Sequence, residues 1–181
     1  MAEALPVVLI PGLNCSARLY AEQIPALWRF GPVQVADHTR NDSMDAIASR
    51  ILAAAPPRFA LAELSMGGYL ALTIVRHAPK NDEALRERVR LMAEETGAQA
   101  FLRQQQAIMT RSDARPFLPA IKCPTLVLVG DGDALTPPAL SQEIAAGVTG
   151  SRLVVIADCG HLSTMERPDA VNRALIEWMT G

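Results

Sequence analysis

The chain has 181 residues, half of them apolar, and its 17 basic and 19 acidic side chains give a formal net charge of −2. A core of this size fits a single domain over residues 1–181, because each half alone would be only marginally stable. The balanced charge, without long runs of either sign, excludes the electrostatic footprint of a nucleic-acid or anionic-membrane binder and favours a small-molecule substrate.

Three widely spaced cysteines, Cys15, Cys123 and Cys159, form no Cys-x-x-Cys pair. An odd number of dispersed cysteines argues against a disulfide framework and a structural zinc site, so we expect reduced, mostly buried thiols. The first residues lack the basic segment, apolar stretch and cleavage site of a secretory leader. No segment approaches the ~20 apolar residues of a membrane span. These features predict a cytoplasmic protein with no membrane partner.

Five short, nearly continuous apolar runs alternate with longer helix-like stretches. The predicted strands are residues 7–10, 33–36, 59–64, 125–129 and 153–156, and the predicted helices are residues 20–28, 44–54, 67–77, 82–109, 138–147 and 168–179. Such runs are typical of strands covered on both faces, which predicts a three-layer α/β/α fold with a mostly parallel sheet. The stretch 80–119 is predicted to be helical in character, with a break expected at Gly97. Because ligands bind beyond the carboxyl ends of parallel strands, the residues after each run are the functional candidates.

A serine follows the third predicted strand. Ser65 lies between the strand 59–64 and the helix 67–77 and is followed by Met66 and two glycines. A serine on such a sharp turn presents its hydroxyl above the sheet edge, and the small residues permit the turn. The alternative is a serine that only caps the helix. We interpret Ser65 as the candidate nucleophile.

A serine hydroxyl needs a base to take its proton, and three histidines are available. His161 follows the strand 153–156, which delivers it to the same sheet edge as Ser65. His38 also follows a strand, but that strand precedes the serine in the chain, and solvation explains its polar loop. His77 falls late in a helix, where a cation is favoured. We therefore predict His161 as the general base.

Two aspartates, Asp131 and Asp133, lie in the turn-rich loop after the strand 125–129. Either could be only a turn former, since aspartate side chains bind their own backbone. We prefer Asp133 as the acid that orients His161, because the longer excursion from the strand brings its carboxylate over the sheet edge. Ser65, Asp133 and His161 each follow their own predicted strand, so a catalytic triad explains them better than coincidence.

Backbone N–H groups are the preferred donors to a developing oxyanion, because they are rigid. Met66 N–H is predicted to be one donor. The second is expected in the loop after the strand 7–10, where Pro11 has no N–H and Gly12 allows a sharp turn. Leu13 is our choice, and Asn14 is the alternative.

These motifs resemble the α/β-hydrolase superfamily, in particular its small esterase-like and lactonase-like members. The matching segments are Val8-Leu9-Ile10-Pro11-Gly12-Leu13, Leu64-Ser65-Met66-Gly67-Gly68-Tyr69-Leu70-Ala71-Leu72, Cys123-Pro124-Thr125-Leu126-Val127-Leu128-Val129-Gly130 with Asp133, and Gly160-His161-Leu162 with Glu166-Arg167-Pro168. They spread over nearly the whole chain and are specific for the fold but not for the substrate. The resemblance implies a serine hydrolase with an α/β-hydrolase fold.

Glu63 departs from the family pattern Gly-x-Ser-x-Gly, because it stands where a glycine or another small residue is expected. That position normally lets strand and helix approach closely. Glu63 must therefore either distort the turn or direct its carboxylate outward, where it could repel an anionic substrate. The remaining alternative is a carboxylate that is simply solvated at the sheet edge.

A second departure is a missing strand. Relatives usually place a strand directly after the nucleophile helix and then an inserted helical cap, whereas the stretch 80–119 is helical in character. The resemblance therefore implies that residues 80–119 are a short helical, cap-like insertion. The fold is therefore predicted to be a reduced α/β-hydrolase fold that lacks this strand. Either the strand 125–129 pairs beside the strand 59–64, or a second subunit supplies the missing part. The second alternative would make the protein a homodimer.

The leading interpretation is a serine hydrolase that cleaves carboxylic esters through an acyl-enzyme on Ser65, without a metal or organic cofactor. A lactonase, thioesterase or perhydrolase would use the same residues. From a different class, Glu63 and the missing strand leave open a catalytically impaired or silent binding or scaffolding protein.

Overall fold

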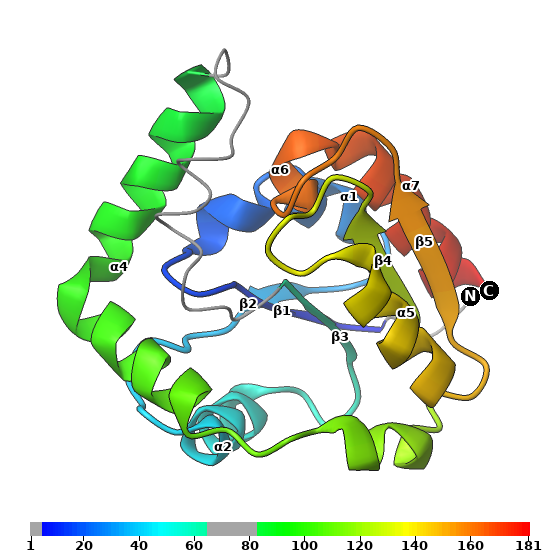
Figure 1. Cartoon of the computed structure of the whole chain (residues 1–181), viewed down its shortest axis with the longest axis horizontal. Coiled ribbons are helices and arrows are strands. Elements are labelled where there is room, and N and C mark those ends of the chain that lie inside the picture. Colours follow the sequence, from blue (N-terminus) through cyan, green and yellow to red (C-terminus); the bar gives the residue numbers. More distant parts are fainter. Residues whose placement is uncertain (1–4, 65–82) are drawn as a thin grey trace. The chain divides into compact units, whose positions relative to one another are not determined.

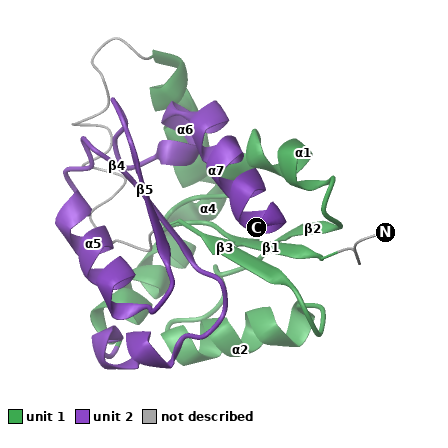
Figure 2. Ribbon diagram, turned by 90° about the vertical axis from the view of Figure 1, so that its right-hand side faces the viewer, with its two compact units in different colours: residues 1–111 green, residues 112–181 purple. Residues whose placement is uncertain are grey.

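The computed structural model describes residues 5–64 and 83–181. It divides into two compact units, residues 1–111 and 112–181 (Figure 2). The predicted helix 67–77 and the turn that carries Ser65 lie outside the described residues. The prediction of a single domain over residues 1–181 stays a prediction.

The first unit contains a three-stranded parallel sheet in the order β2-β1-β3. The strands are β1 (Val7–Ile10), β2 (Val33–Val35) and β3 (Ala60–Glu63). Val7 of the central strand pairs with Val33 on one side and with Ala60 on the other. The first three residues of β1 are at most 1% exposed, as expected for a central strand covered on both faces.

Helices of this unit lie on both faces of the sheet: α1 and α2 are on opposite sides in both views (Figures 1 and 2). The described helical segments are η1 (Ala17–Tyr20), α1 (Gln23–Leu27), α2 (Met44–Ala54) and α4 (Glu83–Met109). The predicted helix 20–28 was wrong in extent, because two short segments replace it. Pro25 lies in the first turn of α1 and has no N–H to bond back toward residue 21, so one helix cannot run through both.

The long helix α4 is interrupted at Gly97, as predicted. Gly97 has φ +74°, a conformation that costs a glycine little. Beyond this break, Ala107 is fully buried in a core cluster with Val8 of β1 and with Ile47 and Ile51 of α2. The C-terminal half of α4 and the helix α2 therefore share the core that supports β1.

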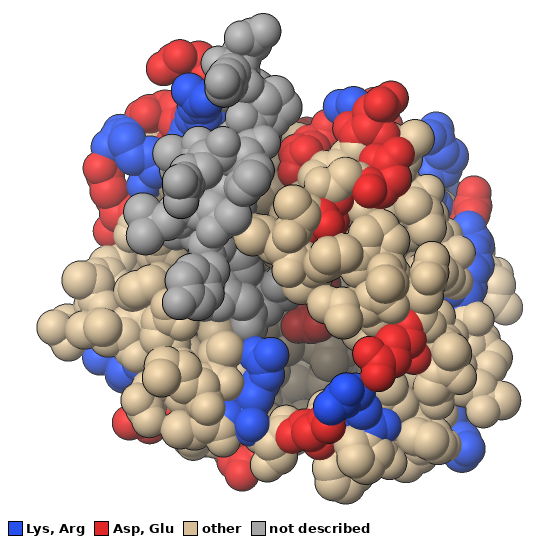
Figure 3. Space-filling model, viewed as in Figure 1, with Lys and Arg blue, Asp and Glu red and all other residues tan. Residues whose placement is uncertain are grey.

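Acidic and basic side chains are interspersed over α4 (Figure 3). Arg90 forms ion pairs with Glu87, at 2.6 Å, and with Glu94. Such exposed ion pairs lie on the solvent-facing side of the helix and add little to the stability of the protein. None of the helices in the described ranges combines the length and the apolar character of a membrane span.

The second unit contains two parallel strands, β4 (Leu126–Gly130) and β5 (Arg152–Ile156), in register from Leu126 opposite Arg152. Its helical segments are η2 (Arg115–Ala120), α5 (Pro138–Gly147), α6 (Ser163–Glu166) and α7 (Pro168–Thr180). The helices α5 and α7 lie on opposite sides of the two strands (Figure 2). Val171 of α7 packs with Ile156 and Cys159 in the core of this unit. The strands and the longer helices match the predicted ones to within one or two residues.

The ladders of both units are parallel, and helices cover two sides of each, as the α/β/α prediction requires. In the described part of the stretch 80–119 the chain forms α4 and η2 without a strand, so this part is helical in character, as predicted. That it is a cap-like insertion stays a prediction. The pairing of the strand 125–129 beside 59–64, and its alternative in a second subunit, stay predictions.

Candidate active site

Asp133 and His161 are hydrogen-bonded inside the second unit. The Nδ1 atom of His161 lies 2.8 Å from Oδ2 of Asp133, and the two side chains are only 6% and 5% exposed. Because an ionised carboxylate only accepts hydrogen bonds, Nδ1 must carry the proton, which leaves the lone pair on Nε2. That Nε2 atom is buried and makes no hydrogen bond within the described part of the chain. The ring is therefore held in the tautomer that a general base requires.

The loop after β4 surrounds the Asp133 carboxylate with donors. Oδ1 accepts the backbone N–H groups of Leu135 and Thr136, both at 2.9 Å, and Oδ2 accepts the Thr136 hydroxyl at 2.8 Å. Burial by itself raises the pKa of Asp133, but the hydrogen bonds from His161 and Thr136 outweigh it, so that the pKa lies below its ordinary value. Asp133 is thus kept ionised and fixed in direction.

Asp131, the alternative acid, has different surroundings. It is exposed, and its Oδ1 accepts the backbone N–H of Cys159 at 3.2 Å. That hydrogen bond is the main reason why the pKa of Asp131 is lowered. Asp131 therefore ties the loop after β4 to the loop after β5, whereas the contact with His161 belongs to Asp133.

Gly130, at the end of β4, allows these two loops to cross closely. A Cβ atom added at this position would lie 2.2 Å from the Cys159 carbonyl oxygen and 2.4 Å from that of Gly160. The same Cys159 oxygen accepts the N–H of Gly132 at 2.9 Å. The absence of a side chain at residue 130 thus lets the backbone just before His161 pass over the strand end, toward Asp133.

Glu166 of α6 holds the peptides on both sides of His161. Its Oε2 accepts the N–H of Gly160 at 2.8 Å, and its Oε1 accepts the N–H of Leu162 at 2.9 Å. Sequence reasoning included Glu166 only as part of a family-like segment and missed this role. The available signal was an acidic residue a few positions after the histidine, but acidic residues at such places usually only begin a helix.

The candidate oxyanion loop lies in the first unit, directly after β1. Leu13 is 1% exposed, and its N–H makes no hydrogen bond within the described residues. Asn14 has φ +58°, and its N–H donates to the side-chain oxygen of Gln104 at 2.9 Å. Ser65 and Met66 lie outside the described residues. Within the described residues the N–H of Asn14 is thus occupied and that of Leu13 is not, and the choice between the two as oxyanion donor stays a prediction.

Glu63 ends β3, where it is paired with Ile10 of β1. The residue as a whole is exposed, but protein surrounds its carboxyl group, and this loss of water raises the pKa of the carboxyl. The distorted turn, the carboxylate directed outward and the solvated carboxylate all stay predictions for this residue. The strand itself remains regular up to Glu63.

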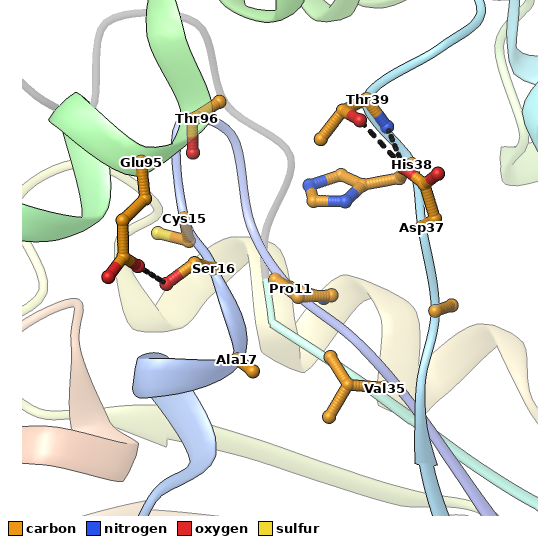
Figure 4. Close-up of a pocket in the computed structure, with 11 residues that line it drawn as sticks. Pro11, Cys15, Ser16, Ala17, Val35, Asp37, His38, Thr39, Glu95 and Thr96 are labelled. Carbon is orange, nitrogen blue, oxygen red and sulfur yellow. Dashed lines mark hydrogen bonds between the residues drawn. The ribbon is translucent and has the colours of Figure 1, made fainter.

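A cavity of about 110 Å³ lies at the carboxyl ends of β1 and β2 (Figure 4). Pro11, Cys15, His38 and Thr96 are among its lining residues. Burial raises the pKa of Cys15 to about 12 and lowers the pKa of His38, so the thiol is protonated and the imidazole neutral near neutral pH. Within residues 5–64 and 83–181, no three His, Cys, Asp or Glu side chains are grouped as metal ligands would be.

Comparison of the sequence with those of known proteins gives matches that each cover part of this chain and part of the other protein. The chain is 36% identical over 77 residues to a putative non-heme bromoperoxidase, BpoC, of Mycobacterium tuberculosis, covering 42% of this chain and 29% of that protein. It is 29% identical over 113 residues to a pimeloyl-[acyl-carrier protein] methyl ester esterase of Stenotrophomonas maltophilia, covering 62% of this chain and 44% of that protein. The matches thus span less than half the length of these relatives.

The fold has close structural counterparts. A thermophilic esterase from Thermogutta terrifontis superimposes with a TM-score of 0.81 at 25% identity, over 97% of this chain and 89% of that one. The sequence profile of the alpha/beta hydrolase family matches residues 15–174. The predicted fold class is therefore confirmed. Because that profile spans most of the chain, the protein belongs to the alpha/beta hydrolase family.

Proposed function

We propose that this protein is a serine hydrolase that cleaves carboxylic esters through an acyl-enzyme on Ser65. The observation that carries the proposal is the buried Asp133–His161 pair, in which Nδ1 is bound at 2.8 Å and Nε2 has no hydrogen bond within the described residues. A buried, unpartnered imidazole nitrogen costs stability, which a role in proton transfer explains. Membership of the alpha/beta hydrolase family supports the same reading.

In the proposed acylation, the Ser65 hydroxyl passes its proton to Nε2 of His161 while its oxygen attacks the ester carbonyl carbon. The carbonyl oxygen becomes an oxyanion, which the N–H groups of Leu13 and Met66 stabilise. Asp133 stabilises the imidazolium that forms, because its carboxylate faces the Nδ1–H. When the tetrahedral intermediate collapses, the alcohol leaves with the proton from Nε2, and the acyl group remains on Ser65.

Deacylation repeats these steps with water. The Nε2 atom of His161 takes a proton from a water molecule, whose oxygen attacks the acyl carbon. The second tetrahedral intermediate expels Ser65, which recovers its proton from the imidazolium, and the carboxylic acid leaves. The same residues thus act twice, and the proton balance closes on each turnover.

The ester is the substrate class that the relatives favour. Two of the similar proteins carry esterase names, a methyl ester esterase and a thermophilic esterase. Lactones and thioesters would pass through the same acyl-enzyme, and a perhydrolase would resolve that acyl-enzyme with hydrogen peroxide in place of water. A panel of p-nitrophenyl esters, lactones and thioesters, compared by kcat/KM, would rank them.

The test is hydrolysis of p-nitrophenyl acetate and butyrate by the wild type and three variants. Ser65→Ala should lose at least ~10³-fold in kcat, because the nucleophile is removed. Asp133→Asn should lose on the order of 10³- to 10⁴-fold, because the amide no longer enforces the Nδ1–H tautomer. Asp131→Asn is the matched control, two residues away in the same loop, and should stay within about tenfold of the wild type, since Asp131 does not contact His161.

Circular dichroism of each variant checks that a loss of activity is not a loss of fold. A fluorophosphonate probe should label the wild type and not Ser65→Ala. If the folded wild type neither turns over any ester in the panel nor reacts with the probe, the proposal is wrong, and binding of a ligand by that inactive protein would support the silent binding protein. Equal rates for the wild type and Ser65→Ala would also exclude it.

A further inference from the structure

The loop after β1 is held by two buried polar side chains that come from distant parts of the first unit. The carbonyl oxygen of Gly12 lies 3.0 Å from Nε2 of His38, and the N–H of Asn14 donates to Oε1 of Gln104 at 2.9 Å. His38 follows β2 and is 2% exposed, whereas Gln104 belongs to α4 and is fully buried. Burying a polar side chain costs free energy unless the side chain forms hydrogen bonds. The hydrogen bonds to the loop therefore account for the burial of these two polar side chains, and they hold the loop in return.

His38 fixes the direction of the Gly12–Leu13 peptide together with the N–H of Cys15, which donates to the same Gly12 oxygen at 3.1 Å. A carbonyl oxygen only accepts, so Nε2 of His38 must be the donor and carry the hydrogen. In a planar trans peptide the C=O and the N–H point in opposite directions. The bond from His38 to the Gly12 oxygen therefore turns the Leu13 N–H away from His38. Figure 4 shows the His38 ring directed from its own segment toward the loop that carries Pro11 and Cys15.

Gln104 removes the competing donor. Its side-chain oxygen accepts the hydrogen bond of the Asn14 N–H, whereas the Leu13 N–H makes no hydrogen bond within the described residues. The amide nitrogen of Gln104 is buried and has no partner in the same part of the chain. Within the described residues, the bond to Asn14 is therefore the one hydrogen bond that this buried amide makes.

We propose that His38 and Gln104 are positioning residues that orient the loop after β1, so that the N–H of Leu13, and not that of Asn14, stabilises the oxyanion. The inference rests on the proposed serine hydrolase and adds which groups prepare its oxyanion hole. Neither side chain has to touch the substrate, because both act through the backbone of Gly12, Leu13 and Asn14.

The first test replaces the His38 donor. His38→Leu should lower kcat for p-nitrophenyl butyrate by about 10- to 100-fold, which is less than the loss of a whole oxyanion donor, while KM changes less than about twofold. His38→Gln places an amide N–H near the position of Nε2 and should recover most of kcat. A role in packing alone predicts no such recovery, since leucine fills the space better than glutamine.

The second test removes the acceptor on α4. Gln104→Met should also lower kcat by about tenfold at constant KM, because the loop can then present either N–H. Gln106→Met is the matched control: it makes the same change two residues away on an exposed side chain and should leave kcat unchanged. If the thermal transition shows that His38→Leu does not fold, the comparison of Gln104→Met with Gln106→Met tests the inference instead.

A tetrahedral inhibitor reads the oxyanion site directly. Phenylboronic acid forms a tetrahedral adduct with an activated serine, and its inhibition constant should rise in the His38→Leu and Gln104→Met variants by the same factor as kcat/KM falls. An active wild type with unchanged kcat and inhibition constant in both variants would overturn the inference while leaving the proposed function intact. Equal losses in His38→Leu and His38→Gln would also overturn it. A wild type that neither hydrolyses the ester nor binds the boronic acid would overturn the proposed function itself.

Discussion

Two aspartates in one loop show how the surroundings assign a role to a residue. Asp131 is exposed and binds a backbone N–H of the neighbouring loop, whereas Asp133 is buried and faces the imidazole of His161. Both have lowered pKa values, so the shift alone does not distinguish them. The distinguishing observation is the partner: only an acid that contacts the base can hold its tautomer.

The pH dependence of stability tests the surroundings of Asp133. Its folded-state pKa lies below the unfolded value of ~3.9, so its contribution is complete above that value and is lost as the pH falls through the folded pKa. Urea unfolding at about pH 7 should show Asp133→Asn to be less stable by about 2 kcal/mol. This difference should stay constant down to about pH 5 and shrink below about pH 4. A difference that grows on acidification would contradict the assignment.

At the scale of elements, the site depends on the close approach of the two loops that follow the parallel strands β4 and β5. The strand β4 ends in Gly130, and the backbone of residues 159 and 160 lies directly against it. The short helix α6 then returns Glu166 to both peptides that flank His161. Gly130 therefore lets the loop after β5 approach the loop after β4, and the Glu166 carboxylate holds the backbone around His161 in place.

Gly130→Ala tests this close approach. The added Cβ would stand 2.2 Å from a backbone oxygen, so the loop before His161 must move, and we expect a loss of about 3 kcal/mol in unfolding free energy together with lower activity. Gly132→Ala is a graded control in the same loop, because its Cβ would lie 3.3 Å from the same oxygen. Chemical denaturation and ester hydrolysis should both rank wild type above Gly132→Ala and Gly132→Ala above Gly130→Ala. The reverse order would mean that the crossing is looser than described.

At the scale of the whole molecule, the three cysteines are free, as their spacing predicted. Cys15 is buried in the core of the first unit and Cys159 in that of the second, and burial raises the pKa of each thiol to about 12. Cys123, which precedes β4, is exposed. The chain thus has one accessible thiol. The other two become accessible only when the core around each of them opens.

Thiol modification would follow this difference. In the native protein at about pH 8, a disulfide reagent should modify one thiol quickly and the other two at least ~100-fold more slowly, because only a thiolate that solvent can reach reacts. In denaturant all three should react together. Cys123→Ser removes the fast phase and leaves the slow ones, which identifies the fast thiol. Three equal rates in the native protein would show that the cores open readily.

Some properties of this protein follow from its sequence alone. Apolar runs placed all five strands to within one or two residues, because strand burial is encoded locally in continuous apolar stretches. Helices with a long periodic pattern were found in the same way. The short segments η2 and α6 were missed, and one helix was drawn through Pro25, because a few residues carry no readable period. The order of the candidate serine, aspartate and histidine, each behind its own strand, was readable as well.

The tertiary structure alone decided which groups meet. Asn14 and Gln104 are 90 positions apart, and Asp133 and His161 are 28 apart, so no local pattern links either pair. The sequence favoured Asp133 over Asp131, but its contact with His161, the occupied N–H of Asn14 and the hydrogen bonds of Glu166 all depend on the directions of groups in the folded chain. Such bonds require directions and distances of a few tenths of an ångström. Composition and periodicity record burial but not direction, which is why these decisions had to come from the folded chain.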